Sequence, residues 1–99
     1  MSAQIREYAV KPGEMGEWIQ EWRAKVVPLR EKFGFEVLGA WTIDQTDRFV
    51  WIIRYAGPRS FEEADADYYG SAERKAMTPD PARHLAETTG RLMTEVEKG

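Results

Sequence analysis

Two polar side chains near the N-terminus, Arg6 and Tyr8, have the types and the spacing of a small-molecule site. In an extended strand, residues two positions apart leave the same face about 6.5–7 Å from each other. A guanidinium can orient a carboxylate or an enolate, and a phenol can donate a proton to it. We therefore predict that Arg6 binds an anionic group and that Tyr8 acts as an acid or base. The alternative is a structural hydrogen-bonded pair with Tyr8 in the core.

His84 is the second candidate for acid/base chemistry, because it is the single histidine of the chain and histidine titrates near neutrality. It lies in a polar segment, between Arg83 and Leu85. The alternative is a solvent-exposed histidine with no catalytic role, since one histidine forms no constellation by itself. A role as the axial ligand of a haem is a further interpretation, and no other residue supports it.

The aromatic content is high, with four Trp, four Tyr and four Phe in 99 residues. Such a load predicts a core, an interface or a pocket for an organic ligand that is larger than a minimal fold needs. If Arg6 and Tyr8 face such a pocket, aromatic side chains form its walls. The predicted wall residues are Trp18, Trp22, Trp41, Trp51, Tyr55 and Tyr68.

Several classes of site are excluded by composition. The absence of Cys removes disulfides, a thiolate nucleophile and thiolate metal ligands, and one histidine cannot build a multi-histidine metal site. The run Asp65-x-Asp67-x-x-Gly70 resembles the start of a calcium loop, but its twelfth position is Ala76 where a bidentate Glu belongs. We therefore predict a protein with no metal and no cofactor.

Charge and hydropathy exclude further partners. The formal net charge is −3 and there is no basic run, which argues against nucleic-acid binding. No apolar run approaches the roughly 20 residues that span a bilayer, so no membrane partner is expected. The first residues lack the apolar stretch of a secretory signal, which predicts a cytoplasmic location.

The first half of the chain predicts a strand and then a helix that position these residues. Residues 4–10 favour a strand that ends at Lys11-Pro12-Gly13. Pro28 should bend the following helix or end its first half, and Gly34 has the position of a left-handed cap. Apolar residues at steps of three and four mark the buried face of this helix: Met15, Trp18, Ile19, Trp22, Val26, Leu29 and Phe33.

Residues 36–43 and 48–55 are rich in β-formers and are separated by a short polar gap, which predicts a hairpin. If Ile43 pairs with Arg48, one face holds Leu38, Ala40, Thr42, Phe49, Trp51, Ile53 and Tyr55. The other face holds Val37, Gly39, Trp41, Ile43, Val50, Ile52 and Arg54. Both faces are mostly apolar, although 99 residues leave little chain to cover the second one. We therefore predict a homodimer.

In the second half, Ser60 and Glu63 form a capping box that opens a helix through about Tyr69. Asp80 and Pro81 predict a short helix over residues 83–87, which Gly90 ends, and residues 92–96 a last strand. The order β-α-β-β-α-β is that of an α+β, ferredoxin-like fold with a four-stranded antiparallel sheet. The length favours one domain over residues 1–99.

The chain resembles the NIPSNAP family. The segment Arg6-Glu7-Tyr8-Ala9-Val10-Lys11-Pro12-Gly13 is similar to the start of such domains. The resemblance continues through the helix with Trp18 and Trp22 to Val27-Pro28-Leu29-Arg30, and through the segments 38–42 and 51–55. It implies a dimeric α/β barrel, in which two protomers pack their sheets face to face and each holds a cavity between sheet and helices.

This superfamily includes cofactor-free monooxygenases, polyketide cyclases and isomerase-like proteins, and related cyclases use a histidine from the second helical half. The resemblance implies a cofactor-independent enzyme for a small apolar, aromatic or polyketide-like molecule, acting by cyclisation, proton transfer or oxygenation. The alternative is a non-catalytic dimer that binds a ligand or a partner, with structural aromatic residues.

Overall fold

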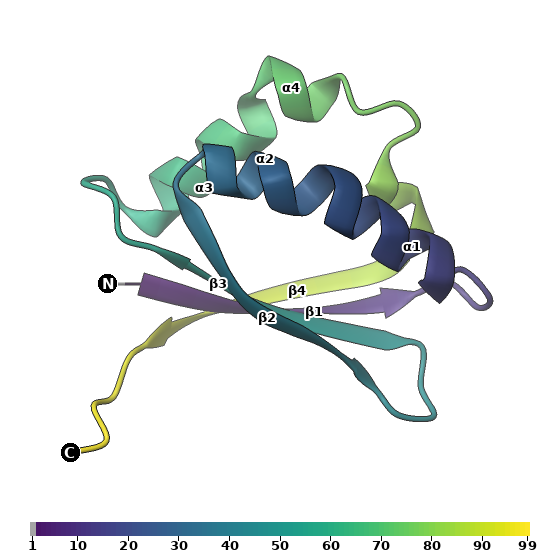
Figure 1. The fold of residues 1–99 in the computed structure, drawn as a ribbon, viewed down its shortest axis with the longest axis horizontal. Helices are drawn as coiled ribbons and strands as arrows, with labels where there is room; N and C mark the ends of the chain where they lie inside the picture. The colour runs from purple at the N-terminus through teal and green to yellow at the C-terminus, as the bar shows by residue number, and fades with distance from the viewer. Residues whose placement is uncertain (1) are drawn as a thin grey trace.

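The computed structural model describes residues 2–99, and its four strands form one antiparallel sheet. The strands are β1 (Ser2–Val10), β2 (Phe35–Ile43), β3 (Arg48–Tyr55) and β4 (Leu85–Thr94), in the spatial order β2-β3-β1-β4. Figure 1 shows the helices that connect them on one side of the sheet. This arrangement is the ferredoxin-like fold that the order of elements predicts.

The predicted first helix extends over three consecutive helical segments: α1 (Met15–Glu21), a π-helical turn η1 (Trp22–Val26) and α2 (Val27–Lys32). Pro28 does not end the helix. The ring of a proline clashes with the carbonyl four residues earlier, and that residue, Ala24, lies in the wider π-helical turn. Gly34 ends the helix with a φ of +90°, which confirms the predicted left-handed cap.

The hairpin of β2 and β3 has the predicted register near its turn, where Ile43 pairs with Arg48 and Ala40 with Trp51. The register then shifts between Val37 and Gly39, so a β-bulge lies at Leu38. The predicted faces of Leu38 and Val37 are therefore wrong, and Val37 pairs with Ile53 and packs against the core. One extra residue reverses the alternation, so Leu38 is 45% exposed while Phe35 enters the core.

The second half begins as predicted and then departs from prediction. Ser60 and Glu63 form both hydrogen bonds of the capping box at the start of α3 (Phe61–Gly70). A short α4 (Ala72–Lys75) and a 3-10 turn η2 (Pro81–His84) follow. The predicted helix over 83–87 is wrong, because β4 (Leu85–Thr94) begins at Leu85 and continues through Gly90, which pairs with Arg6 of β1. The predicted last strand over 92–96 is present, but it starts seven residues earlier and ends at Thr94.

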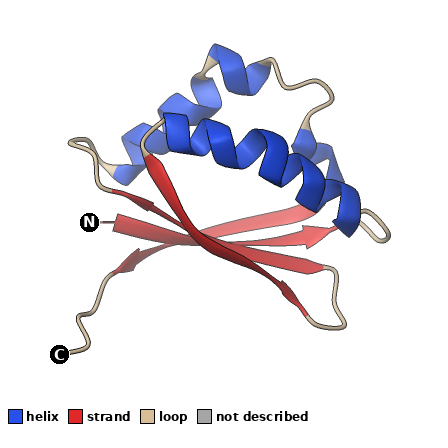
Figure 2. Ribbon diagram, viewed as in Figure 1, coloured by secondary structure: helices blue, strands red, loops and turns tan. Residues whose placement is uncertain are grey.

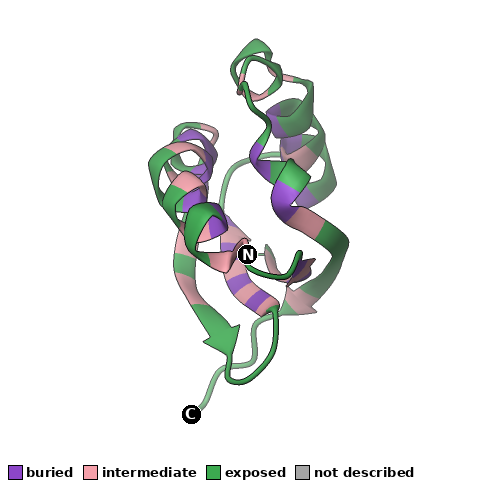
Figure 3. Cartoon of the chain, turned by 90° about the vertical axis from the view of Figure 1, so that its right-hand side faces the viewer, coloured by how far each residue is buried: buried purple, intermediate pink, exposed green. Residues whose placement is uncertain are grey.

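The helices and the sheet form two layers, and the core lies between them (Figure 2). Alternate residues of β1 and β3 are buried against the helices, as the banding of the strands in Figure 3 shows. In the described part of the chain, no element covers the opposite sheet face. That open face exposes Leu38, Trp41 and Ile43. None of the described helices has the length and the apolar character to cross a membrane.

Candidate functional site

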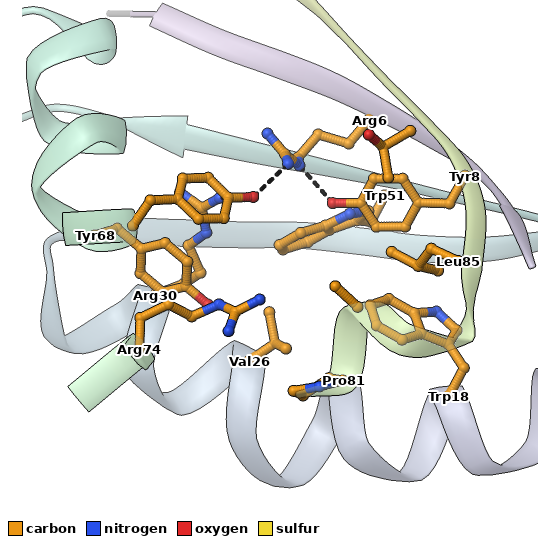
Figure 4. Close-up of a pocket in the computed structure, with 13 residues that line it drawn as sticks. Arg6, Tyr8, Trp18, Val26, Arg30, Trp51, Tyr68, Arg74, Pro81 and Leu85 are labelled. Atoms are coloured by element: carbon orange, nitrogen blue, oxygen red, sulfur yellow. Dashed lines mark hydrogen bonds between the residues drawn. The ribbon is translucent and has the colours of Figure 1, made fainter. Parts of the chain in front are cut away.

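A cavity of about 290 Å³ lies between the sheet and the helices. Among the predicted site residues it brings together Arg6, Tyr8, Trp18, Trp51 and Tyr68, as Figure 4 shows. Arg6 and Tyr8 come from β1, Trp51 from β3, Trp18 from α1 and Tyr68 from α3. Period-two alternation places the three strand residues, Arg6, Tyr8 and Trp51, on the helix-facing side of the sheet.

Arg6 is 9% exposed, and all three of its nitrogens donate hydrogen bonds to neutral oxygens. Nε donates to the Tyr8 hydroxyl at 2.6 Å, Nη2 to the Tyr69 hydroxyl at 2.7 Å and Nη1 to Gln4 Oε1 at 2.7 Å. Burial lowers the pKa of Arg6, but its contacts with Tyr8 and Tyr69 outweigh burial and raise it overall. The guanidinium therefore stays charged.

No carboxylate among residues 2–99 forms a salt bridge with Arg6. Glu95 faces Arg54 at 3.6 Å, and Glu63 is held by the capping box. A buried cation without a carboxylate is costly unless polar oxygens or an anion meet it. Arg6 is thus the cation of this cavity that has no described carboxylate in direct contact, and Asp65 acts on it only at longer range.

Arg30 and Arg74, which the sequence analysis did not select, also line the cavity, and each has a carboxylate partner. Arg30 is 1% exposed and donates to Asp65 Oδ1 at 2.7 Å. Its guanidinium carbon lies 3.9 Å from the centre of the Tyr68 ring. Arg74 forms a 3.0 Å ion pair with Asp80. The sequence contained a signal that Arg30 is buried, because Arg30 lies four residues after Val26 and so shares the apolar face of the helix.

Three phenol hydroxyls surround these cations. Tyr69, also missed by the sequence analysis, accepts from Arg6 and, at 3.3 Å, from Arg30. Tyr68 is 1% exposed, and its hydroxyl has no hydrogen-bond partner among the described residues. Burial raises the pKa of Tyr8, partly offset by Arg6, and burial likewise raises the pKa of Tyr68. Tyr8 and Tyr68 therefore keep their protons at neutral pH and offer them as donors.

His84 lies outside this cavity, although its neighbours Pro81 and Leu85 line it. It is not solvent-exposed either: the residue is 2% exposed, with Nδ1 2.8 Å from Glu14 Oε1 and Nε2 3.0 Å from Glu21 Oε2. Carboxylates only accept hydrogen bonds, so both ring nitrogens carry protons. The hydrogen bond with Glu21 is the main cause that raises the pKa of His84. This ion-paired histidine joins η2 to α1.

The same cluster includes a possible metal-ligand set. One ligand atom each from Glu17, Glu21 and His84 lies within 4.8 Å of the others. Both carboxylate oxygens of Glu21 accept hydrogen bonds at 2.8 Å from Arg83, and His84 Nε2 donates to the same carboxylate. In this structure the three residues are therefore engaged in ion pairs rather than arranged around an open coordination position.

The remaining predicted wall residues lie away from the cavity. Trp22 is buried in edge-to-face contacts with Phe49 and Trp51, whose ring centres are 5.2 and 5.6 Å from its own. Tyr55 packs on Phe35 at the far end of the sheet. Trp41 belongs to the open sheet face, where it is 55% exposed. The structure therefore does not bring these three aromatic residues to Arg6 and Tyr8.

Comparisons with known proteins agree with this architecture. The sequence matches the family model described as NIPSNAP over residues 3–97, and a search of curated proteins finds no match. A NIPSNAP domain protein from Burkholderia xenovorans aligns with a TM-score of 0.84 and 15% identity, covering 100% of this chain and 98% of that one.

Two further solved structures have the same fold. A NIPSNAP family protein from Agrobacterium tumefaciens aligns with a TM-score of 0.84 and 14% identity, covering 98% of this chain and 94% of that one. A protein described as an antibiotic biosynthesis monooxygenase aligns with a TM-score of 0.70 and 18% identity, covering 98% and 100%. At these identities the likeness concerns the fold.

Proposed function

The chain belongs to the NIPSNAP family, and from this premise we propose that it is a cofactor-independent enzyme for a small apolar or aromatic organic molecule with an acidic oxygen. The molecule binds in the cavity between sheet and helices, with Arg6 supplying the positive charge and Tyr8 the proton. Trp18, Trp51 and Tyr68 form the walls. Structural neighbours described as antibiotic biosynthesis monooxygenases support an organic substrate.

The observation that carries this proposal is the excess of hydrogen-bond donors in the cavity. Arg6, Arg30 and the hydroxyls of Tyr8, Tyr68 and Tyr69 offer more N–H and O–H groups than the protein oxygens beside them accept. Buried donors without acceptors are unfavourable. An anionic or carbonyl oxygen of a ligand is the chemical group that satisfies them.

The same arrangement suits the three reaction types that the family resemblance implies. Proton transfer, cyclisation and oxygenation of an aromatic or polyketide-like molecule each proceed from an electron-rich oxygen that becomes negatively charged. Donors placed around that oxygen in a buried site stabilise the charge as it develops. Of the predicted acid/base residues, Tyr8 lines the cavity and His84 does not. We therefore assign to the Tyr8 hydroxyl the role of donor to the substrate oxygen.

The proposal is tested by comparing ligand binding of the wild type and Arg6→Met. We use native mass spectrometry of the purified protein, followed by titration with 1-naphthoate and 2-naphthol as aromatic probes. We expect the wild type to retain or bind a small aromatic compound and Arg6→Met to lose it. Lys25→Met, which removes a cation from the helix surface, is the matched control. Binding that is equal in all three proteins contradicts the assignment of the cavity.

A non-catalytic role is the second candidate, and a specific observation favours it. All three nitrogens of Arg6 already donate to protein oxygens, so the cluster is able to hold the fold without a ligand. A ligand that binds without being transformed, as followed by mass spectrometry of the recovered compound, identifies the chain as a binding protein. A product of altered mass, or one with exchanged hydrogen, identifies an enzyme.

We further propose that the whole chain, as one domain, pairs with a second copy through its open sheet face. That face exposes apolar side chains, with Trp41 55%, Leu38 45% and Ile43 40% exposed. A contiguous patch of this kind is unusual on a soluble monomer. An isologous contact covers it on both copies at once. Light scattering that yields the mass of a monomer at micromolar concentration contradicts this pairing.

A further inference from the structure

Arg6 holds two phenol oxygens at two nitrogens of its guanidinium. Nε donates to Tyr8 at 2.6 Å and Nη2 to Tyr69 at 2.7 Å. An arginine fork normally binds both oxygens of one carboxylate in this manner. Here two tyrosine hydroxyls, from β1 and from the end of α3, take the place of the carboxylate. Figure 4 shows the Arg6 side chain ending at these two bonds above Trp51.

The hydrogen bonds from Arg6 determine where the hydroxyl protons of Tyr8 and Tyr69 point. Each phenol oxygen accepts an N–H of Arg6, so its own proton is directed away from the guanidinium. No side chain in the described part of the chain accepts the protons of Tyr8 or Tyr69, and both residues line the cavity. The hydroxyl of Tyr68, buried and without a partner, is a third donor in the same cavity.

We propose that Tyr8 and Tyr69, held side by side by Arg6, form an oxyanion hole that binds the ionised oxygen of an enol or a phenol. This inference rests on the proposed function and names its substrate class. Arg6 is then a positioning residue for the two phenols and balances the charge of the bound anion. Tyr8 and Tyr69 are the groups that touch the substrate, and the proton of the ionising substrate passes to water.

The chemistry of the cavity favours an enol or phenol over a carboxylate. The two occupied nitrogens of Arg6 are no longer free to grip a carboxylate, whereas phenol donors that meet at one point suit one oxygen atom. Trp18, Trp51 and Tyr68 provide flat apolar walls. The volume of about 290 Å³ lies at the lower end of the range for ligand pockets. A compact, planar ring compound fits these conditions.

The test uses 2-naphthol, whose neutral and anionic forms differ in absorbance and fluorescence, and naphthalene as the analogue without oxygen. The wild type, Tyr69→Phe and Tyr55→Phe are titrated with both probes across pH. Tyr69 is 42% exposed, but its hydroxyl accepts from Arg6 and Arg30, so a denaturant melt of Tyr69→Phe accompanies the titration and establishes that the variant is folded. Tyr55 lies outside the cavity, and its variant is the matched control for loss of a phenol hydroxyl.

We expect the wild type and Tyr55→Phe to bind 2-naphthol as its anion at a pH where the free probe is neutral. In Tyr69→Phe, the affinity for the anion falls about tenfold to hundredfold, because one hydrogen bond to a charged oxygen is lost. The affinity for naphthalene stays the same. A bound probe that remains neutral, or an anion affinity unchanged in Tyr69→Phe, overturns the oxyanion hole. Failure of both probes to bind the wild type overturns the proposed ligand cavity itself.

Discussion

Arg6 and Tyr8 leave the same face of β1, and Nε of Arg6 donates a 2.6 Å hydrogen bond to the Tyr8 hydroxyl. The two interpretations that the sequence left open for this pair are therefore compatible. The pair is hydrogen-bonded, as a structural role requires, and both residues also line the cavity. A paired phenol keeps its own proton free for a ligand, whereas a carboxylate partner would have neutralised Arg6.

Arg6→Met separates binding from stability. We expect a loss of about 1–3 kcal/mol in the free energy of unfolding, since three hydrogen bonds disappear but no protein carboxylate is left unpaired. Urea denaturation measures this loss. A loss beyond about 4 kcal/mol indicates instead that Arg6 is a member of a buried ion-pair network.

Trp22→Ala tests the core under the long helix. Trp22 is 8% exposed and packs edge-to-face on Phe49 and Trp51, outside the cavity. Its removal should therefore cost about 3–5 kcal/mol, the usual cost of deleting a buried large aromatic side chain. Denaturant melts of this variant and of Arg23→Ala, at the exposed neighbouring position, give the comparison. A cost near that of the control means that Trp22 borders an open space.

Ile52→Asp tests the pairing of two copies. Ile52 lies on the open face, half-buried between Ile5 of β1 and Gly39 of β2. An aspartate there meets water in the monomer but becomes an unpaired buried charge in the dimer. Light scattering should show a monomer or an unfolded chain, while Gln20→Asp, which adds the same charge at an exposed position of α1, keeps the dimer. A folded, dimeric Ile52→Asp protein would assign the interface to another surface.

The ion pair of His84 and Glu21 predicts a stability maximum in mildly acidic solution. The folded pKa of His84 is raised above 6.5, mainly by Glu21, so its contribution is complete below 6.5 and is lost as pH rises through the folded pKa. Arg83 is the main cause that lowers the pKa of Glu21 from 4.5 to about 2, and this contribution is lost as pH falls toward 2. The two contributions overlap between pH 4.5 and 6.5.

Urea denaturation across pH measures this dependence. In Glu21→Gln the free energy of unfolding should depend less on pH on both sides of the maximum. The substitution removes the titrating carboxylate and the main cause of the raised pKa of His84. Lys11→Gln, outside the cluster, should retain the wild-type profile. A wild-type free energy of unfolding that stays constant as pH rises past neutrality contradicts the role of His84.

Much of the fold could be predicted because its signals are local. The apolar stripe of the first helix, the capping box at Ser60 and the cap at Gly34 each depend on residues a few positions apart. Strand β3 buries Phe49 and Trp51 as the alternation predicts. The family resemblance, with the same order of elements, is confirmed by the match over residues 3–97.

The errors arose where pairing between distant segments overrides local preference. Asp80 and Pro81 signal a helix start, but only the short turn η2 follows, because β1 offers an unpaired edge to which residues from Leu85 onward bond. Likewise, the bulge at Leu38 depends on how β2 pairs with β3, and Gly39 beside it, a glycine inside a strand, is the local signal that the sequence analysis did not use.

The sequence by itself determined that Arg6 and Tyr8 share one strand face and that the chain is rich in aromatic side chains, which predicted a core, an interface or a pocket. Only the tertiary structure decided which residues meet them. Tyr69 reaches Arg6 across 63 positions of sequence, and Arg30 reaches Asp65 across 35. His84 is instead drawn into an ion pair with Glu21. Periodicity specifies which face a side chain takes within its element, whereas its partners depend on how separate elements pack.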